Sequence, residues 1–236
     1  MQPANRILPN IGIVATEASG DQLGGHLICA LKACLPQAQF IGIGGPNMLA
    51  AGMQSLFPME KLAVHGYVEI LRCLPQIVWI RRKLRNYFFR HRPHILIGID
   101  SPDFNLGLEE KLKQRGVPTV HYVSPSIWAW RGERIHKIKR AVSHMLTLFP
   151  FELPLYEKAG IPVTYVGHPL AELLPDVPDH AAAREQMRLL PTTKVIALLP
   201  GSRQNELHYM ADTFIATARC ISQVLAGVQF LVPLHS

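Results

Sequence analysis

The 236-residue sequence lacks the long apolar runs of a membrane-spanning helix, because no stretch of about eighteen uncharged apolar residues occurs in it. It also lacks a secretory leader pattern. The first residues, MQPANRILPNIGIV, hold one arginine and a short apolar run interrupted by Pro9 and Asn10, with no small-residue cleavage site after it. These absences exclude a spanning helix and predict a cytoplasmic location.

Metal-binding and common nucleotide-binding motifs are also missing. The four cysteines form no C-x-x-C pair and have no companion histidines at zinc spacing, so we expect neither disulfides nor a metal site. The segment GIGGPN has Asn47 where the third glycine of G-x-G-x-x-G belongs, and no G-x-x-x-x-G-K occurs. We therefore expect no metal, no nicotinamide or flavin cofactor, and no P-loop chemistry.

Positive charge is present in excess and is concentrated in two places. The formal charge is +7; residues 72–92 hold seven Lys or Arg and no acid, and residues 131–140 hold five with one acid. Such clusters predict an anionic partner, although a solvated surface is the commonest role of a charge run. No nucleic-acid recognition motif accompanies them, so nucleic acid is not expected as a partner.

Short apolar runs alternate with helix-like segments along the whole chain. The expected strands lie at residues 11–16, 39–45, 94–100, 119–124, 145–149, 163–167, 194–201 and 229–234. Several are apolar at consecutive positions, which is typical of parallel strands covered on both faces. The pattern predicts an α/β fold with a Rossmann-like, doubly wound parallel sheet.

A proline-rich polar segment separates the sixth and seventh expected strands. We predict a first domain over residues 1–170, a linker over 171–190, and a second, incomplete domain over 191–236. Two strands and one helix cannot bury enough surface to fold alone. The last residues therefore either dock on the first domain or belong to a longer protein, and we favour the second.

Ligands of open parallel sheets bind beyond the carboxyl ends of the strands, so the loops after each run are the candidate sites. After the first run, Ser19 and Gln22 fit a capping box that opens a helix from Asp21, while Glu17 has no evident structural role. After the third run, Asp100 ends a buried strand, where a carboxylate is costly without a function or a partner. Asp103 instead precedes a helical segment, where a carboxylate favours the helix start.

Two further loops combine groups that bind sugars and phosphates. In SPSIWAWRGERIHKIKR, Trp128 and Trp130 either stack on a ligand ring or wedge the loop onto the core, and the sequence favours neither alternative. In LLPGSRQNEL, residues 201–203 place a glycine, a serine and an arginine at a strand-to-helix turn. Backbone amides, a hydroxyl and a guanidinium at such a turn fit a diphosphate, with simple capping as the rival explanation.

The segment from 64 to 89 is both apolar and basic. Two apolar stripes run along this segment when it is helical. One stripe can pack on the sheet, which leaves the other exposed unless something else covers it. A protein groove or an anionic membrane surface would cover the second stripe. We expect Pro75 to divide the segment into two helices.

Seven motifs stand out along the chain: EASGDQLGG (17–25), GIGGPNM (42–48), GIDSPDFN (98–105), HYVSPSIWAWR (121–131), FPFE (149–152), VGHP (166–169) and LLPGSR (198–203). Together they make the sequence resemble the lipid-A-disaccharide synthase family of inverting glycosyltransferases from Gram-negative bacteria. Their order and spacing are those of the family, and the match covers essentially the whole chain. The family usually has glycine where this chain has Thr16, whose side chain narrows the first loop, and its members are about half as long again.

The resemblance implies a GT-B fold in which this chain forms the N-terminal half and the start of a second Rossmann-like domain. It implies condensation of UDP-2,3-diacylglucosamine with 2,3-diacylglucosamine 1-phosphate, at the inner face of the cytoplasmic membrane, without a cofactor or metal. Peripheral association with anionic lipid and a homodimer are compatible with it.

The site residues follow from the matched motifs. We assign Asp100 as the general base. Substrate binding is assigned to Glu17, Ser19, Asn105, Trp128 and Arg131, and diphosphate binding to Gly201, Ser202 and Arg203. A UDP-sugar epimerase or hydrolase of the same architecture, or a non-catalytic fragment, remain the alternatives.

Overall fold

The computed structural model describes residues 9–62, 67–130, 132–201 and 204–233. The chain separates into two compact units, Met1–Leu173 and Leu174–Ser236. Arg131, Ser202 and Arg203, three of the predicted site residues, lie outside the described residues.

The first unit is built on a parallel sheet of seven strands in the order β3-β2-β1-β4-β5-β6-β7. The strands are β1 (Asn10–Ala15), β2 (Gln39–Ile43), β3 (Gln54–Ser55), β4 (Ile95–Ile99), β5 (Thr119–Tyr122), β6 (His144–Thr147) and β7 (Val163–Tyr165). The register places Val14 of β1 between Ile43 of β2 and Gly98 of β4. This order confirms the predicted doubly wound α/β fold.

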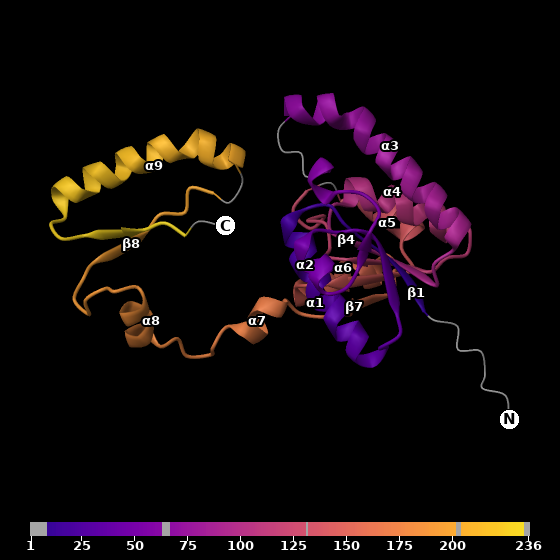
Figure 1. Cartoon of the computed structure of the whole chain (residues 1–236), viewed down its shortest axis with the longest axis horizontal. Coiled ribbons are helices and arrows are strands. Elements are labelled where there is room, and N and C mark those ends of the chain that lie inside the picture. Colours follow the sequence, from indigo (N-terminus) through magenta and orange to yellow (C-terminus); the bar gives the residue numbers. More distant parts are fainter. Residues whose placement is uncertain (1–8, 63–66, 131, 202–203, 234–236) are drawn as a thin grey trace. The chain divides into compact units, whose positions relative to one another are not determined.

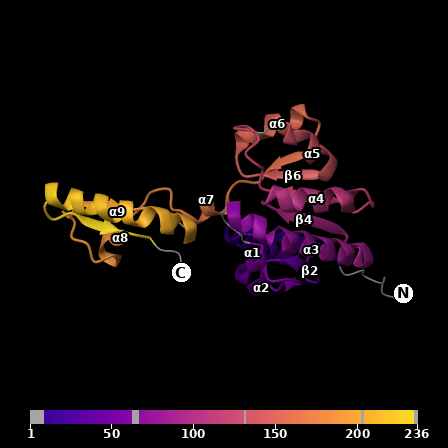
Figure 2. The same cartoon turned by 90° about the horizontal axis from the view of Figure 1, so that it is seen from above.

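Helices cover both faces of this sheet (Figures 1 and 2). The α-helices of the unit are α1 (Ala18–Cys34), α2 (Pro46–Ala50), α3 (Tyr67–His91), α4 (Pro102–Lys113), α5 (Arg134–Ala141), α6 (Leu153–Lys158) and α7 (Pro169–Leu173); η1 (Met59–Lys61) and η2 (Pro150–Glu152) are single 3₁₀ turns. Ile28 of α1 packs on Ile13 and Ile99 on one face. On the other face, Leu84 of α3 packs with Val14, and Ile138 of α5 packs with Tyr156 of α6 in a separate cluster.

All eight runs expected to be strands contain one, and the central strands β1 and β4 are buried between two helix layers, as their apolar runs predicted. The two-residue strand β3 was missed, since it has no apolar run of its own. The expected break at Pro75 was wrong: α3 continues through this residue. One proline removes a single helical hydrogen bond, and the buried side chains of Ile80, Leu84 and Phe88 still hold the rest of the helix on the sheet.

The second unit contains α8 (His180–Gln186), β8 (Val195–Ala197), α9 (Gln204–Val224) and β9 (Gln229–Leu231). Its two strands pair in parallel, with Val195 opposite Gln229. Asp179 caps α8, where its Oδ1 accepts a hydrogen bond from the Ala182 amide at 3.0 Å. No described residue of this unit is buried. Over the described parts of both units, no helix has the length and hydropathy needed to cross a membrane.

Candidate functional site

The strand order reverses between β1 and β4, so the loops after these strands diverge and leave a crevice at the carboxyl edge of the sheet. A cavity of about 390 Å³ lies there, which we call the switch-point cavity. Its polar wall includes Thr16 and Glu17 after β1 and Asp100 and Ser101 after β4, and its apolar wall includes Ile77 of α3. Two predicted site residues, Glu17 and Asp100, are thus brought to one cavity by strands that are neighbours in the sheet.

Asp100 also lines a second cavity of about 390 Å³, the aromatic cavity, at the ends of β4, β5 and β6. Its lining residues are Asp100, Pro102, Val123 to Trp128, Trp130, Arg134, Phe149 and Glu152. The Asp100 backbone has a positive φ of 50°, which is uncommon for a residue other than glycine, and its amide donates to the Tyr122 carbonyl at 2.8 Å. The partly exposed Asp100 therefore stands at the junction of both cavities.

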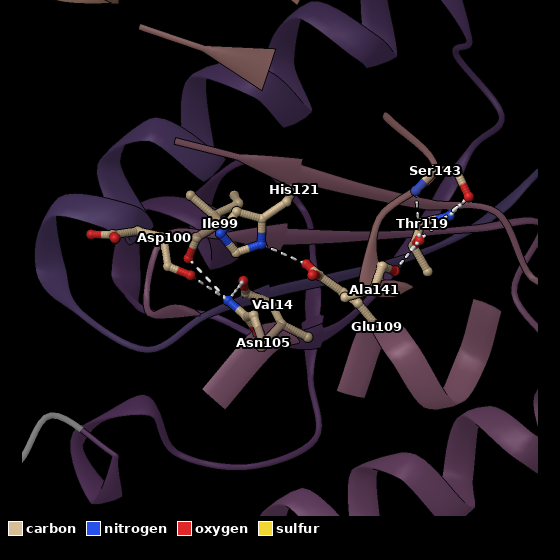
Figure 3. Close-up of polar contacts among 9 residues, drawn as sticks. All are labelled: Val14, Ile99, Asp100, Asn105, Glu109, Thr119, His121, Ala141 and Ser143. Carbon is tan, nitrogen blue, oxygen red and sulfur yellow. Dashed lines mark hydrogen bonds and ion pairs between the residues drawn. The ribbon is translucent and has the colours of Figure 1, made fainter. Parts of the chain in front are cut away.

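Asn105 holds this turn from below (Figure 3). Its side chain is completely buried, and its Nδ2 donates to the carbonyl oxygens of Asp100 at 2.9 Å, Ile99 at 3.2 Å and Val14 at 3.4 Å. These carbonyls belong to the ends of β1 and β4 and to the turn itself. Asn105, which was predicted to bind substrate, therefore lies beneath the turn, and its side-chain amide is hydrogen-bonded to the backbone that carries Asp100.

The two carboxylates of GIDSPDFN both line the switch-point cavity but have different partners. Ser101 occupies the position before α4, so Asp103 is not the cap residue, but its place at the helix start is as expected. Asp103 lies in the first helical turn, and its exposed carboxylate accepts hydrogen bonds from Arg134 Nη2 at 2.8 and 3.1 Å. Asp103 thus ties α4 to α5 and leaves Asp100 as the carboxylate that lines both cavities.

The first motif folds differently from the expectation. The predicted capping box was wrong, because α1 begins at Ala18 with Glu17 at the cap position, and Ser19 lies exposed inside the first turn. Ser19 lines neither of the two cavities. Thr16, which stands where the family usually has glycine, is buried, and its hydroxyl donates to Ser101 Oγ at 2.6 Å. The added side chain therefore joins the two loops of the switch-point cavity.

Asp21 of the same motif has a structural role that local pattern could not reveal. The residue is 1% exposed. Its carboxylate accepts hydrogen bonds from the backbone amides of Gly45, Asn47 and Met48 at 2.7, 2.9 and 3.1 Å, and from Asn47 Nδ2 at 2.9 Å. Asp21 therefore supplies the cap of α2 from a different helix.

Large aromatic side chains are exposed around the aromatic cavity. Trp128 and Phe151 meet edge to face at 5.4 Å between ring centroids, and Phe149 stacks on Phe151 at 5.5 Å. Trp128 is 55% exposed and Trp130 58%. The two tryptophans therefore do not wedge the loop onto the core. Trp128 presents an apolar surface next to Asp100.

Two residues that line the aromatic cavity, Ser124 and Glu152, were missed from the sequence, as was Tyr156, which is fully buried next to Ser124. Ser124 Oγ lies 2.6 Å from the Tyr156 hydroxyl, and Phe149 donates its amide hydrogen to Glu152 Oε2 at 3.2 Å. Burial raises the pKa of Glu152, against hydrogen bonds from Ser124 and the backbone that lower it, and burial raises the pKa of Tyr156 to about 12. Of these residues, the sequence drew attention only to Glu152, as the acid that ends the motif FPFE.

A buried pair behind the site was also missed. Glu109 of α4 and His121 of β5 are both fully buried, with 2.7 Å between Glu109 Oε1 and His121 Nδ1 (Figure 3). An ideal Cβ built on Gly98 would lie 2.0 Å from Glu109 Oε1, so only glycine leaves room for this carboxylate. The pair fixes α4 to the strand that leads into the aromatic cavity.

In the second unit, Gly201 follows β8 with a positive φ of 129°. An ideal Cβ there would lie 2.5 Å from Glu206 Cβ, so this turn requires glycine. The described residues contain no group of three or more His, Cys, Asp or Glu side chains able to hold a metal ion.

Comparison with solved structures shows other proteins with the same fold. The UDP-GlcNAc 2-epimerase from Neisseria meningitidis superimposes with a TM-score of 0.60 at 10% identity, covering 97% of this chain and 66% of the other. A glycotransferase of kitacinnamycin superimposes with a TM-score of 0.58 at 15% identity, covering 95% and 65%. At these identities the similarity concerns the fold alone.

Sequence comparison is far more specific. The chain is 58% identical over 227 residues to the lipid-A-disaccharide synthase of Methylobacillus flagellatus and 55% identical over 224 residues to that of Chromobacterium violaceum. These alignments cover 96% and 95% of this chain but only 60% and 58% of the relatives, so the chain spans about three fifths of their length. The family model for lipid-A-disaccharide synthetase matches residues 11–236, and the chain belongs to this family.

Proposed function

We propose that this chain forms the acceptor-binding part of a glycosyltransferase that joins UDP-2,3-diacylglucosamine to 2,3-diacylglucosamine 1-phosphate and releases UDP. The observation that carries the proposal is the position of Asp100, at a backbone turn shared by two cavities at the switch point of the sheet. Family membership supports the choice of substrates.

In the proposed reaction, the acceptor 6-hydroxyl attacks the anomeric carbon of the donor while the bond from that carbon to the UDP oxygen breaks. Asp100 accepts the hydroxyl proton, which makes the oxygen a better nucleophile, and a base of this kind contributes about 10²–10⁴-fold. Attack from the face opposite to UDP inverts the anomeric configuration. Arg203 and the amides that follow Gly201 are proposed to stabilise the charge on the departing diphosphate.

We further propose that the protein acts at the inner face of the cytoplasmic membrane, where acylated substrates reside. The described half of α3 supports this location. Trp79 is 52% exposed, and Lys83 Nζ lies 5.6 Å from the centroid of its ring. An exposed tryptophan next to cations suits an interface between lipid and water.

The decisive experiment measures UDP release by the full-length protein that contains this chain, with both acylated sugars, for wild type and Asp100→Asn. We expect the variant to lose about two orders of magnitude or more in kcat/KM. Glu110→Gln is the matched control, because it neutralises a carboxylate that lines neither cavity and pairs at the surface with Arg140, and it should retain near-normal turnover.

Near-normal turnover by Asp100→Asn, with unchanged thermal stability, would remove Asp100 as the base. Turnover of UDP-N-acetylglucosamine without any acceptor would instead favour the epimerase or hydrolase alternative.

A further inference from the structure

A third cavity, which the proposed reaction does not use, lies between α5 and α6. It has a volume of about 340 Å³ and is lined by Ile127, Gly132, Ile135, His136, Lys139, Leu155, Lys158 and Ala159. Its wall is mostly apolar, since Ile127, Ile135, Leu155 and Ala159 contribute it. The volume lies within the range of about 300–1,000 Å³ that is typical of small-molecule sites.

The polar part of the lining is entirely basic. His136, Lys139 and Lys158 line the cavity, and the lining contains no carboxylate. Lys139 Nζ donates to the Ala159 carbonyl at 2.7 Å, so it bridges the two helices along the edge of the cavity. His136 and Lys158 are exposed, and within the described residues neither side chain has a hydrogen bond or ion pair. Two exposed basic side chains therefore remain available to an anion at the edge of an apolar cavity.

Positive charge is in excess on α5, next to the cavity. Four of its eight residues are Arg or Lys and none is acidic. Arg134 and Arg140 pair with Asp103 and Glu110 of α4, and within the described residues Lys137 and Lys139 pair with no carboxylate. The basic C-terminal part of α3 lies on the same face of the sheet, since α3, α4 and α5 pack there side by side (Figure 1). A cationic face of this kind attracts an anionic bilayer, at about 1 kcal/mol for each Lys or Arg near the lipid surface.

We propose that the α5–α6 cavity binds one acyl chain of an anionic membrane phospholipid, with His136 and Lys158 contacting its phosphate. The apolar wall removes part of the chain from water, and the basic edge selects a negatively charged head group. The site is separate from the switch-point cavity and shares only Ile127 with the aromatic cavity. It would hold the first unit on the bilayer while a substrate occupies the cavities at Asp100.

Photolabelling tests this assignment on the whole 236-residue chain. Vesicles of phosphatidylglycerol that carry a photoactivatable group in one acyl chain are irradiated with the protein, and the adducts are mapped by mass spectrometry. We expect adducts on residues 132–141 and 153–159. Vesicles of phosphatidylcholine with the same labelled chain should give about tenfold less adduct, because their head group carries no net charge. Labelling confined to other segments, or equal labelling from both lipids, would overturn the proposal.

Two variants with matched controls test the contacts. Lys158→Glu should weaken labelling about tenfold in low salt, whereas Lys32→Glu on α1, which packs on the other face of the sheet, should have a much smaller effect. Leu155→Gln should also reduce labelling, whereas Leu49→Gln on α2, a similarly exposed leucine, should not. Circular dichroism verifies that each variant is folded. Wild-type labelling by folded Lys158→Glu and Leu155→Gln would refute the site.

A competition experiment distinguishes the bilayer from the substrate as the source of the chain. Soluble 2,3-diacylglucosamine 1-phosphate should leave the adducts in place. Complete displacement by it would assign the cavity to the acceptor and overturn the phospholipid assignment. No step of these measurements requires UDP-sugar turnover, so their outcome is independent of the proposed glycosyl transfer.

Discussion

Replacement of either member of the buried Glu109–His121 pair should lower the free energy of unfolding of the first unit. Replacement of both should lower it by less than the sum of the two single losses. Glu109→Leu leaves the buried Nδ1 of His121 without its acceptor, at a cost of about 1–3 kcal/mol. His121→Leu leaves a fully buried carboxylate without its partner, at a cost of about 3–5 kcal/mol. The double variant contains neither polar group, so we expect a coupling energy of about 2–3 kcal/mol.

The assay is urea unfolding followed by tryptophan fluorescence. All three tryptophans, Trp79, Trp128 and Trp130, belong to the unit Met1–Leu173, so the signal reports the unfolding of that unit even if the other unfolds separately. Glu110→Leu is the matched control. Glu110 follows Glu109 directly but pairs at the surface with Arg140, whose side chain is 61% exposed, so the loss should be below about 1 kcal/mol. Additive losses in the double variant would refute the reasoning.

Two further predictions use the same fluorescence assay. Because burial raises the pKa of Glu152 above 4.5, the native state holds this proton more tightly than the unfolded chain, and the free energy of unfolding should fall as the pH rises through the raised value. Glu152→Gln should remove this part of the pH dependence above pH 4.5, and an unchanged slope would assign it to other groups. Asp21→Asn replaces an acceptor oxygen by an amide that faces backbone N–H donors, so it should cost about 2 kcal/mol. A loss below about 0.5 kcal/mol would show that water replaces the carboxylate there.

The sheet could be predicted from the sequence because burial on both faces leaves a local signal. Each central strand must be apolar at consecutive positions, and β4, with the sequence ILIGI, shows this directly. The loops that follow such strands are candidate sites because of the sheet topology, and this is why Asp100 and Glu17 were predicted as site residues. The short strand β3 carries no such signal, since its two residues, Gln54 and Ser55, are polar.

Contacts between distant segments could not be predicted in this way. Asp21 and its partners Gly45, Asn47 and Met48 are separated by 24 to 27 residues, so no pattern among neighbouring residues predicted that Asp21 caps α2. The capping box predicted at the start of α1 failed for a local reason. A capping box requires its serine at the position before the first helical turn, and that position belongs to Glu17.

Asn105 shows the same limit of prediction from local sequence. Asn105 was selected because it belongs to the motif GIDSPDFN, and a role in substrate contact was the natural inference. Its complete burial, with the amide directed to the carbonyls of Val14, Ile99 and Asp100, depends on how α4 lies across two strand ends. Asn105→Asp would place a carboxylate among these carbonyl oxygens, and only the structure reveals why that change is unfavourable.

Backbone strain supplies evidence for the site that does not depend on the family. Asp100, Ser101 and Val123 all have positive φ, at 50°, 44° and 80°, and all line the cavities at the ends of the adjacent strands β4 and β5. Such a conformation costs about 1–3 kcal/mol for each residue, and most for a β-branched side chain such as Val123. Glycine would remove most of this cost at each position, so folding alone does not account for the side chains found there. The hydrogen bonds that hold the turns, from Asn105 to the Asp100 carbonyl and from the Val123 amide to Leu146, stabilise the strained geometry from inside the fold. The strain is therefore concentrated in the turns next to Asp100, the proposed base.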